Sequence, residues 1–426
     1  MKILFFLFLV GAALAKESPL RAILRSPVET LKLYNSFKGE QQLSFQAAED
    51  RMRFRLFRKS AEFVAEENSA EGETAAFALN FFSTLTESEK QSWLGFNATG
   101  AEPNPLPKIN SGLKNDKTPD EKLWTDEGKV TAVRNQGLCG SCWTFGAVGG
   151  LETRYARIAG ILKTFSEQEY LDCVYEGRRN GCRGGWMKDA YEYSARAGGR
   201  LARAADYPYT QQDGYCQASI KPDAMIAAKI AGNVPVAQSE QSNIDALAHG
   251  SLAVAFEVTN RFQSYSNGIF TDHTCRGYPN HAVTAVGYTK DYVLVKNSWG
   301  EYWGDAGYVK FTRNHHNCHL WNHSSYPSLT RTGVVDDDKA KPEPTSPPRP
   351  DPIPDPNCKD SHPTCDKDWC TAGDYIAEEY CQKTCKYCTD GEDDGDDDGG
   401  DDGGDDGCPG GTTLCPDGIC RHEHMC

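Results

Sequence analysis

The pattern of apolar and polar positions divides the middle of the chain into a helical half and a strand half. Apolar residues at helical spacing predict helices at 142–159, 166–173 and 187–197. Short runs rich in apolar and β-branched residues then predict strands at 252–256, 281–288, 292–295 and 307–311. Helices followed by strands favour an α+β protein with two parts and a cleft between them. Residues 142 and 281 would then face each other from opposite walls.

Residues 49–68 form a further, highly charged stretch with helical periodicity. One stripe along it consists of Glu49, Arg53, Phe57, Ser60, Val64 and Asn68. Such spacing places these side chains on one helical face. Any amphipathic helix could show the same stripe, so this alternative stays open.

The start of the chain has the features of a secretory signal peptide. Met1 and Lys2 precede an apolar run at 3–14, and Ala13-Leu14-Ala15 offers a cleavage site after Ala15. The run is too short to cross a bilayer comfortably, and we expect a soluble mature protein. The secretory pathway, ending outside the cell or in the lysosome, is therefore the expected location.

Chain length, cysteine count and charge give further information on domain number, disulfides and partners. The 426 residues exceed what one compact core usually holds. The 17 cysteines predict disulfides, and their odd number leaves one thiol over. Of the net charge of −15, the run 390–407 supplies −11, from ten aspartates and one glutamate. The charge thus marks a solvated linker, with weak calcium binding as the alternative, and gives no reason to expect nucleic acid as a partner.

Three motifs supply the groups that a cysteine-based acyl-transfer enzyme needs. The first, Gln136-Gly-Leu-Cys-Gly-Ser-Cys142-Trp, puts a thiol at the start of the helix predicted at 142–159. The second and third are Asn-His281-Ala-Val and Lys-Asn297-Ser-Trp-Gly. A helix N-terminus and an imidazole together lower a thiol pKa.

We assign one role to each of these groups. Cys142 is the nucleophile, and His281 holds the partner charge and protonates the leaving amine. Asn297 orients the imidazole, and the Gln136 amide with the Cys142 N–H stabilises the oxyanion. No role for Ser298 is evident. Singly, each group has an ordinary structural explanation, but together and in this order they favour catalysis.

Residues 118–334 resemble a papain-family cysteine protease of the cathepsin L type. The resemblance implies a two-lobed fold with a helical lobe and a β-barrel-like lobe, and a zymogen whose pro-region inhibits it. It also implies hydrolysis of peptide bonds in protein or peptide substrates, without a cofactor or metal. The stripe at 49–68 is similar to the family's E-R-F-N-I-N motif, with Ser60 and Val64 as departures. A second pro-region motif departs at Ala78 and at Thr84, which replaces an aspartate, so the family's acid trigger is in doubt here.

The resemblance also implies the lining of the cleft. Gly184 and Gly185 correspond to the strand that binds substrate backbone, and Trp299 would shield the His281–Asn297 pair. Pocket residues for the P2 side chain are Trp186, Met187, Ala255, Pro279, Ala282 and His323. Most of these are apolar, which favours an apolar P2 residue. The short stretch between Cys182 and Cys216 lacks an insertion that would close the cleft, which favours endopeptidase action.

By the same resemblance, disulfides pair Cys139 with Cys182, Cys173 with Cys216, and Cys275 with Cys318. Residues 358–388 carry six cysteines and resemble the ShK toxin module, which implies the pairs Cys358–Cys388, Cys365–Cys381 and Cys370–Cys385. Residues 408–426 could be a truncated second copy, a granulin-like fragment or a two-disulfide cap.

These features divide the chain into seven expected parts. They are the signal peptide 1–15, the pro-region 16–117, the peptidase domain 118–335, a proline-rich linker 336–357, the ShK-like module 358–388, an acidic linker 389–407 and a four-cysteine module 408–426. The sequons at Asn97 and Asn322 predict glycans. We expect a monomer with an extracellular or membrane-protein partner for the ShK-like module.

A rival function is a binding protein that acts through this module on a protease-like scaffold. Tyr375 and Ile376 stand where ShK toxins carry the Lys-Tyr pair that blocks potassium channels, which argues against channel block.

Overall fold

The computed structural model describes residues 19–70, 72–99, 101–105, 118–174, 181–313 and 317–336, together with the backbone of two short strands near the C-terminus. These strands, β10 (Thr413–Leu414) and β11 (Cys420–Arg421), pair antiparallel within a separate unit that spans 346–426. The expectations for the signal peptide, the proline-rich and acidic linkers, and the ShK-like module with its disulfides lie outside the described residues. Among the helices described, none is long and apolar enough to cross a membrane.

The helical lobe is built around α5 (Cys142–Ala159). Trp143, Leu151 and Tyr155 of α5 are buried, and α7 (Met187–Arg196) packs on the same core through Tyr191. The helix stops at Gly160, whose φ of 77° is one that glycine adopts without strain. Ser166 caps α6 (Glu167–Cys173) by accepting the Glu169 N–H at 3.0 Å. Short 3₁₀ turns η2 (Gly181–Arg183) and η3 (Ala218–Ile220) complete the lobe.

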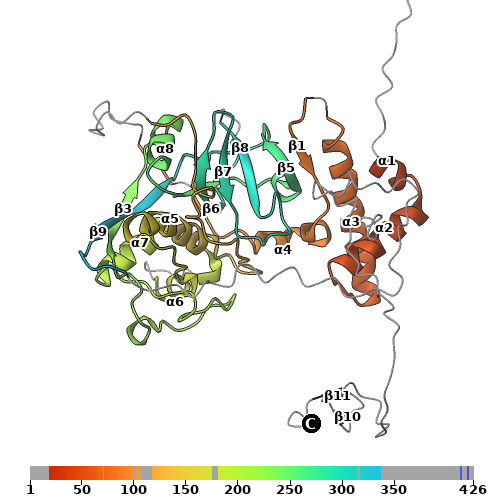
Figure 1. Ribbon diagram of the computed structural model, residues 1–426. Coiled ribbons are helices and arrows are strands. Elements are labelled where there is room, and N and C mark those ends of the chain that lie inside the picture. The colour runs from red at the N-terminus through yellow and green to blue at the C-terminus, as the bar shows by residue number, and fades with distance from the viewer. Residues whose placement is uncertain are drawn as a thin grey trace, which may run out of the picture. The chain divides into compact units, whose positions relative to one another are not determined.

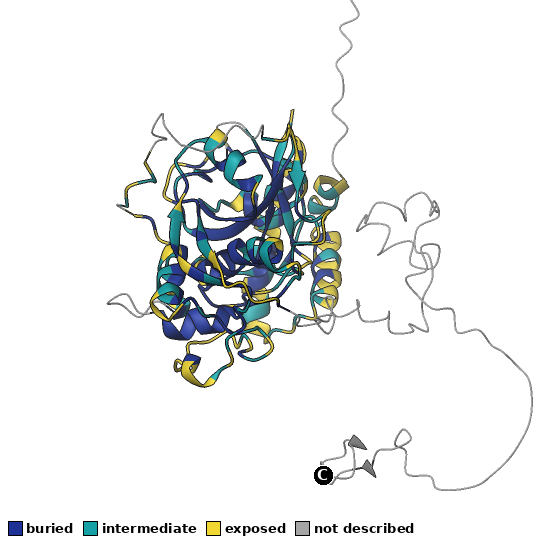
Figure 2. Cartoon of the chain, turned by 60° about the vertical axis from the view of Figure 1, so that its left-hand side comes forward, coloured by how far each residue is buried: buried dark blue, intermediate teal, exposed yellow. Residues whose placement is uncertain are grey.

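A strongly buried sheet forms the second lobe (Figure 1). The central strands β4 (Leu252–Phe256) and β6 (His281–Tyr288) are buried at every position, and Figure 2 shows much of the sheet in dark blue. In order across the sheet, its strands are β1 (Ala75–Phe77), β5 (Tyr265–Phe270), β8 (Tyr308–Thr312), β7 (Tyr292–Lys296), β6, β4, β9 (Ser325–Arg331) and β3 (Ala228–Pro235), with β2 (Lys122–Leu123) paired to β6. Two short helices, α8 (Glu240–Leu247) and α9 (Asn260–Gln263), flank the sheet.

The N-terminal region folds as a helical unit beside the sheet. Its helices are α1 (Pro19–Leu24), α2 (Pro27–Glu40) and α3 (Ala47–Glu67). Aromatic rings of α2 and α3 pack together, with Tyr34 and Phe37 each about 5 Å from Phe57 between ring centroids. The chain then forms β1 (Ala75–Phe77), η1 (Phe81–Thr84) and α4 (Glu87–Gln91).

Strand pairing and ion pairs are among the contacts that attach this unit to the protease lobe. Strand β1 pairs antiparallel with β5, and Arg261 of α9 forms ion pairs with Glu67 and Glu73. All three of these charged side chains are largely buried. Burial of a well-paired charge cluster makes each partner sensitive to loss of the others.

The α+β class predicted from sequence is confirmed, and each predicted helix and strand is present within two residues of its expected bounds. The sequence pattern did not predict the remaining α-helices and strands of residues 19–336, which are α1, α2, α4, α8, α9, β1, β2, β3, β5 and β9. Asp336, one residue beyond the expected end of the peptidase domain, also packs against the helical lobe. Asp336 is buried, forms an ion pair with Lys163 at 2.7 Å and accepts a hydrogen bond from the Tyr155 hydroxyl.

Candidate active site

Cys142 is the first residue of α5 and is the one cysteine of the described residues outside a disulfide. The loop before it is fixed by the Cys139–Cys182 disulfide and by a bond from the Gly140 N–H to the Cys182 carbonyl at 2.9 Å. The thiol therefore lies at the positive end of an 18-residue helix. The site is set on a helix terminus and a crosslinked loop, which together restrict its movement.

His281 opens β6 on the opposite wall, and its neighbour Ala282 donates its N–H to the Cys142 Sγ at 3.4 Å. The His281 Nε2 lies 2.8 Å from the Asn297 Oδ1. That oxygen also accepts the Ser298 N–H at 2.8 Å, which identifies it as an acceptor. Nε2 must then carry the proton, so the lone pair of a neutral imidazole is on Nδ1. Nδ1 has no hydrogen-bond partner among the described residues.

Trp299 covers this pair. Its ring centroid lies 4.6 Å from that of His281, and the tryptophan is almost completely buried. Phe262 and Trp303 pack on its other sides. Water is thereby kept away from the His281–Asn297 hydrogen bond, which is stronger in such surroundings.

The Gln136 side chain lies beside the thiol loop, the loop of residues 137–141 that precedes Cys142. Its Nε2 donates to the carbonyls of Cys139 at 2.8 Å and Trp93 at 2.9 Å, and its Oε1 accepts the Ser298 hydroxyl at 2.7 Å. Ser298 thus determines which end of the amide points into the cleft. Sequence reasoning found no role for Ser298, because its position between Asn297 and Trp299 does not reveal a contact 162 residues away.

A segment of the N-terminal region fills the cleft over these groups. The Gly95 N–H points to the Cys142 Sγ at 3.3 Å, and the Gly95 carbonyl accepts the Gly185 N–H at 2.9 Å. On the other wall, the Phe96 N–H bonds to the Asn280 carbonyl at 3.1 Å. A Cβ at position 95 would lie 1.7 Å from the Gly140 carbonyl oxygen, so only glycine fits over the thiol. The segment uses backbone positions that an extended peptide would need.

Phe96 enters an apolar pocket beside the thiol. Its ring centroid lies 4.5 Å from Trp186 and 5.7 Å from His323. Met187, Ala255 and Ala282 belong to the same buried cluster as Phe96, and Pro279 accepts the Ala98 N–H through its carbonyl. Of the residues expected for this pocket, the structure thus places Trp186 and His323 directly against Phe96 and the three apolar ones in the same buried cluster. Gly184, with a φ of 107°, precedes the Gly185 contact.

Burial under this segment keeps the reactive groups neutral. Desolvation raises the pKa of the Cys142 thiol to about 11, against the opposing effect of the Ala282 and Gly95 N–H groups. Desolvation also lowers the pKa of His281 to about 4, although the Asn297 bond favours the charged imidazole. A thiolate–imidazolium pair is thus disfavoured while the cleft is filled.

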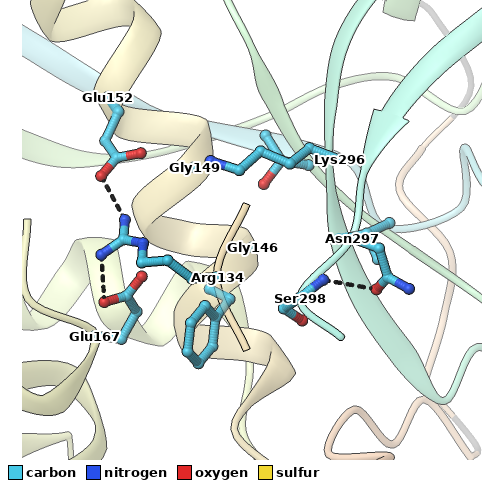
Figure 3. Close-up of a pocket in the computed structure, with 11 residues that line it drawn as sticks. Arg134, Gly146, Gly149, Glu152, Glu167, Lys296, Asn297 and Ser298 are labelled. Carbon is cyan, nitrogen blue, oxygen red and sulfur yellow. Dashed lines mark hydrogen bonds and ion pairs between the residues drawn. The ribbon is translucent and has the colours of Figure 1, made fainter. Parts of the chain in front are cut away.

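Behind the site, charged side chains surround a small cavity where the lobes meet (Figure 3). Arg134 lies between Glu152 at 2.7 Å and Glu167 at 2.8 Å, and Lys296 bonds to the Thr131 carbonyl at 2.8 Å. Burial raises the pKa of Glu167 to about 7, although Arg134 opposes that rise. The cavity of about 20 Å³ has room for about one water molecule. This ionic cluster was not foreseen from the sequence.

The described disulfides join Cys139 to Cys182, Cys173 to Cys216 and Cys275 to Cys318, the pairs that the resemblance implies. In the described residues, the one group with metal-ligand residue types is Asp272 with Cys275 and Cys318. Both of its sulfurs are engaged in the disulfide, so it is not a competent metal site.

Comparisons with known proteins agree with this geometry. The model of the papain family of cysteine proteases matches residues 118–328. An aleurain-like thiol protease of Arabidopsis thaliana is 35% identical over 309 residues, which cover 69% of this chain and 83% of that protein. The cathepsin L-like proteinase of Fasciola hepatica is 33% identical over 310 residues, which cover 70% of this chain and 94% of that protein.

Solved proenzyme structures are also similar. Digestive procathepsin L 3 of the Tenebrio molitor larval midgut is 30% identical, with a TM-score of 0.61 over 70% of this chain and 99% of that one. The ragweed pollen allergen Amb a 11 in its proform is 30% identical, with a TM-score of 0.65 over 72% of this chain and 95% of that one. The segment in the cleft of this chain is therefore its own inhibitory pro-region. With relatives matched at this identity over most of their length, the chain belongs to the papain family of cysteine proteases, which are peptide hydrolases.

Proposed function

We propose that this protein is a secreted or lysosomal cysteine endopeptidase that is made as a zymogen. The observation that carries the proposal is the Cys142 thiol at a helix N-terminus, under a segment that occupies the cleft as a substrate backbone would. His281 with Asn297 and the Gln136 amide lie around the same point. The proposed roles are nucleophile for Cys142, general base and acid for His281, orienting group for Asn297 and oxyanion donor for Gln136.

Removal of the pro-region returns the cleft to water and allows the proton of the thiol to move to His281 Nδ1. The thiolate then attacks the scissile carbonyl, and the carbon becomes tetrahedral. The Gln136 Nε2, released from the Trp93 carbonyl, and the Cys142 N–H stabilise the oxyanion. The imidazolium protonates the leaving amine, which leaves an acyl-enzyme. Water activated by His281 then attacks the thioester and regenerates the thiol.

The pocket around Phe96 indicates the substrate preference. Phe96 is held between Trp186 and His323, with only 3% of its surface exposed. An apolar or aromatic P2 side chain would fill the same space in a substrate. We therefore propose endopeptidase action on proteins and peptides with an apolar P2 residue.

The division into a signal peptide, a pro-region and a peptidase domain is part of this proposal, with the peptidase domain extended to Asp336. The modules beyond it would place the enzyme at an extracellular or membrane protein and take no part in the chemistry. Every catalytic step above uses residues of one chain, so we propose that the enzyme acts as a monomer.

The proposal is tested with short peptides that differ only at P2. Processed wild-type protein should cleave peptides with Phe or Leu at P2 and leave those with Asp uncut, while Cys142→Ser should cleave none. Binding without cleavage by the wild-type protein would favour the rival function, a scaffold for the C-terminal module.

A further inference from the structure

The sequon Asn97-Ala98-Thr99 lies in the pro-region segment that crosses the cleft, two residues beyond Gly95. Sequons of this form accept an N-linked glycan on the asparagine Nδ2 in the secretory pathway. We propose that Asn97 carries such a glycan above the closed cleft. The glycan hinders other protease molecules from cutting the segment and leaves with the pro-region. This inference rests on the proposed entry into the secretory pathway.

The segment presents alternate residues to opposite sides. Phe96 and Ala98 point into the protease and are 3% and 0% exposed, whereas Asn97 and Thr99 are exposed. The Phe96 and Ala98 N–H groups bond to the carbonyls of Asn280 and Pro279. A group attached to Asn97 therefore projects away from the cleft and leaves the inhibitory contacts in place.

The Asn97 amide is also oriented for attachment. Its Oδ1 accepts the Thr99 N–H at 2.9 Å, so the oxygen turns toward the chain and the nitrogen away from it. In the described part of the protein, no hydrogen bond occupies the Asn97 Nδ2. The atom that would carry the glycan is thus free and accessible in the folded zymogen.

The second sequon provides a contrast within the same chain. Asn322 is half-buried, and its Oδ1 accepts the Gln238 Nε2 at 2.8 Å. Its carbonyl accepts the N–H of Asn104, which belongs to the pro-region. The next two residues, His323 and Ser324, are buried. A glycan at Asn322 would press on the pro-region, so we expect this sequon to stay unmodified.

The place of the Asn97 glycan on the pro-region segment would affect how fast the zymogen is activated. The segment that must be cut or displaced for activation is the one that carries it. A bulky, mobile group on the only exposed side of that segment removes approach directions for a second enzyme, and fewer productive encounters mean a lower association rate. Premature activation of the zymogen by an active protease molecule is thereby slowed.

The test uses the full chain with Cys142→Ser, so that it cannot process itself, secreted from a eukaryotic host. Asn97→Gln, Thr99→Ala and Asn322→Gln are added to it one at a time. Thr99→Ala keeps Asn97 and its bond to the backbone N–H, and so separates loss of the glycan from loss of the turn. Intact mass before and after endoglycosidase treatment reports the glycan. Cutting by added purified papain reports access, independently of the activity of this enzyme.

We expect Asn97→Gln and Thr99→Ala to lose the glycan mass and Asn322→Gln to keep it. The two glycan-free proteins should be cut about threefold faster than the parent. An unchanged mass in Thr99→Ala would overturn the assignment of the site. Equal cutting rates for glycosylated and glycan-free zymogens would overturn the shielding role. Neither outcome depends on whether Cys142 is catalytic.

Discussion

Three consecutive residues after β7 have separate tasks in the site. Asn297 holds the His281 Nε2, Ser298 holds the Gln136 amide, and Trp299 covers the imidazole. The chain turn at the end of one strand thus aligns both the proposed base and the proposed oxyanion donor. Ser298 contacts no reacting atom in this arrangement and is a positioning residue.

Ser298→Ala should lower kcat with little change in KM, because the Gln136 amide loses the bond that fixes its orientation. We expect a loss of roughly 1 kcal/mol of transition-state stabilisation, the usual net contribution of one hydrogen bond. Gln136→Ala should cost roughly 10²–10³ in kcat. The double variant should be no slower than Gln136→Ala alone, since Ser298 acts through Gln136. Additive losses in the kinetics of the double variant would contradict this role.

We expect His323 to make pro-region binding sensitive to acid. Burial beside Phe96 and Trp186 lowers the pKa of His323 to about 4, and Lys188 adds to the effect. After release, exposure should return this pKa toward its ordinary value of about 6.5. Between those values the uncovered protein binds more protons, so the covered state is favoured above about pH 6.5 and loses stability as pH falls toward 4.

His323→Leu should therefore shift pro-region release to lower pH. The measurement is the affinity of the separated pro-region for processed enzyme between pH 4 and pH 7. Thr84 replaces the family's aspartate, and Arg53 instead forms two bonds to Glu89 at 2.5 and 2.6 Å. The Arg53 guanidinium lowers the pKa of Glu89 to about 2. The Arg53–Glu89 ion pair therefore stays charged between pH 4 and pH 7. An identical pH dependence in His323→Leu would contradict the assignment.

At the scale of elements, the pro-region uses one strand, one helix face and one extended segment to hold the protease. Strand β1 extends the sheet at β5, α3 contributes Glu67 to Arg261, and residues 93–98 lie in the cleft. The extended segment requires a glycine at its closest approach to the thiol loop, because any side chain would overlap the Gly140 carbonyl.

Gly95→Ala should release latency. The added Cβ would lift the segment from the Cys142 thiol, so the uncut zymogen should gain activity on a short peptide. Gly39→Ala is the matched control, because a Cβ at Gly39 in α2 meets nothing within 4 Å. The readout is peptide hydrolysis before any cut in the pro-region. Full latency in Gly95→Ala would show that this contact is not needed for inhibition.

Sequence reasoning succeeded where a pattern is local. Helix α5 and strands β4 and β6 follow from apolar periodicity, and the Cys142 motif is contiguous. Sequence reasoning failed where the role of a residue depends on contacts with residues far away along the chain. Neither the Ser298–Gln136 bond nor the addition of β1 to the sheet has a local signal, because each joins segments more than 150 residues apart.

For the whole molecule, we propose that the peptidase domain ends at Asp336. Its carboxylate is buried with the Lys163 ammonium and the Tyr155 hydroxyl, so residue 336 is packed against the helical lobe. The tail modules are attached beyond this point.

Asp336→Ala should destabilise the protein by about 3–5 kcal/mol, the cost of removing one partner from a buried ion pair. The measurement is denaturant unfolding of the inactive Cys142→Ser protein, with Lys290→Ala as an exposed control.

A chain that ends just beyond Asp336 should keep its kcat/KM on short peptides. A loss above about tenfold, or 1.4 kcal/mol, would mean that the tail takes part in the site.

The central claim is that Cys142 is the nucleophile and that the pro-region hides it. The most direct measurement is labelling of full-length and processed protein with a thiol-reactive epoxide, followed by mapping of the modified residue by mass spectrometry. We predict one label per processed molecule, on Cys142, and none on the intact zymogen. Labelling of another cysteine, or equal labelling of zymogen and processed enzyme, would contradict the account.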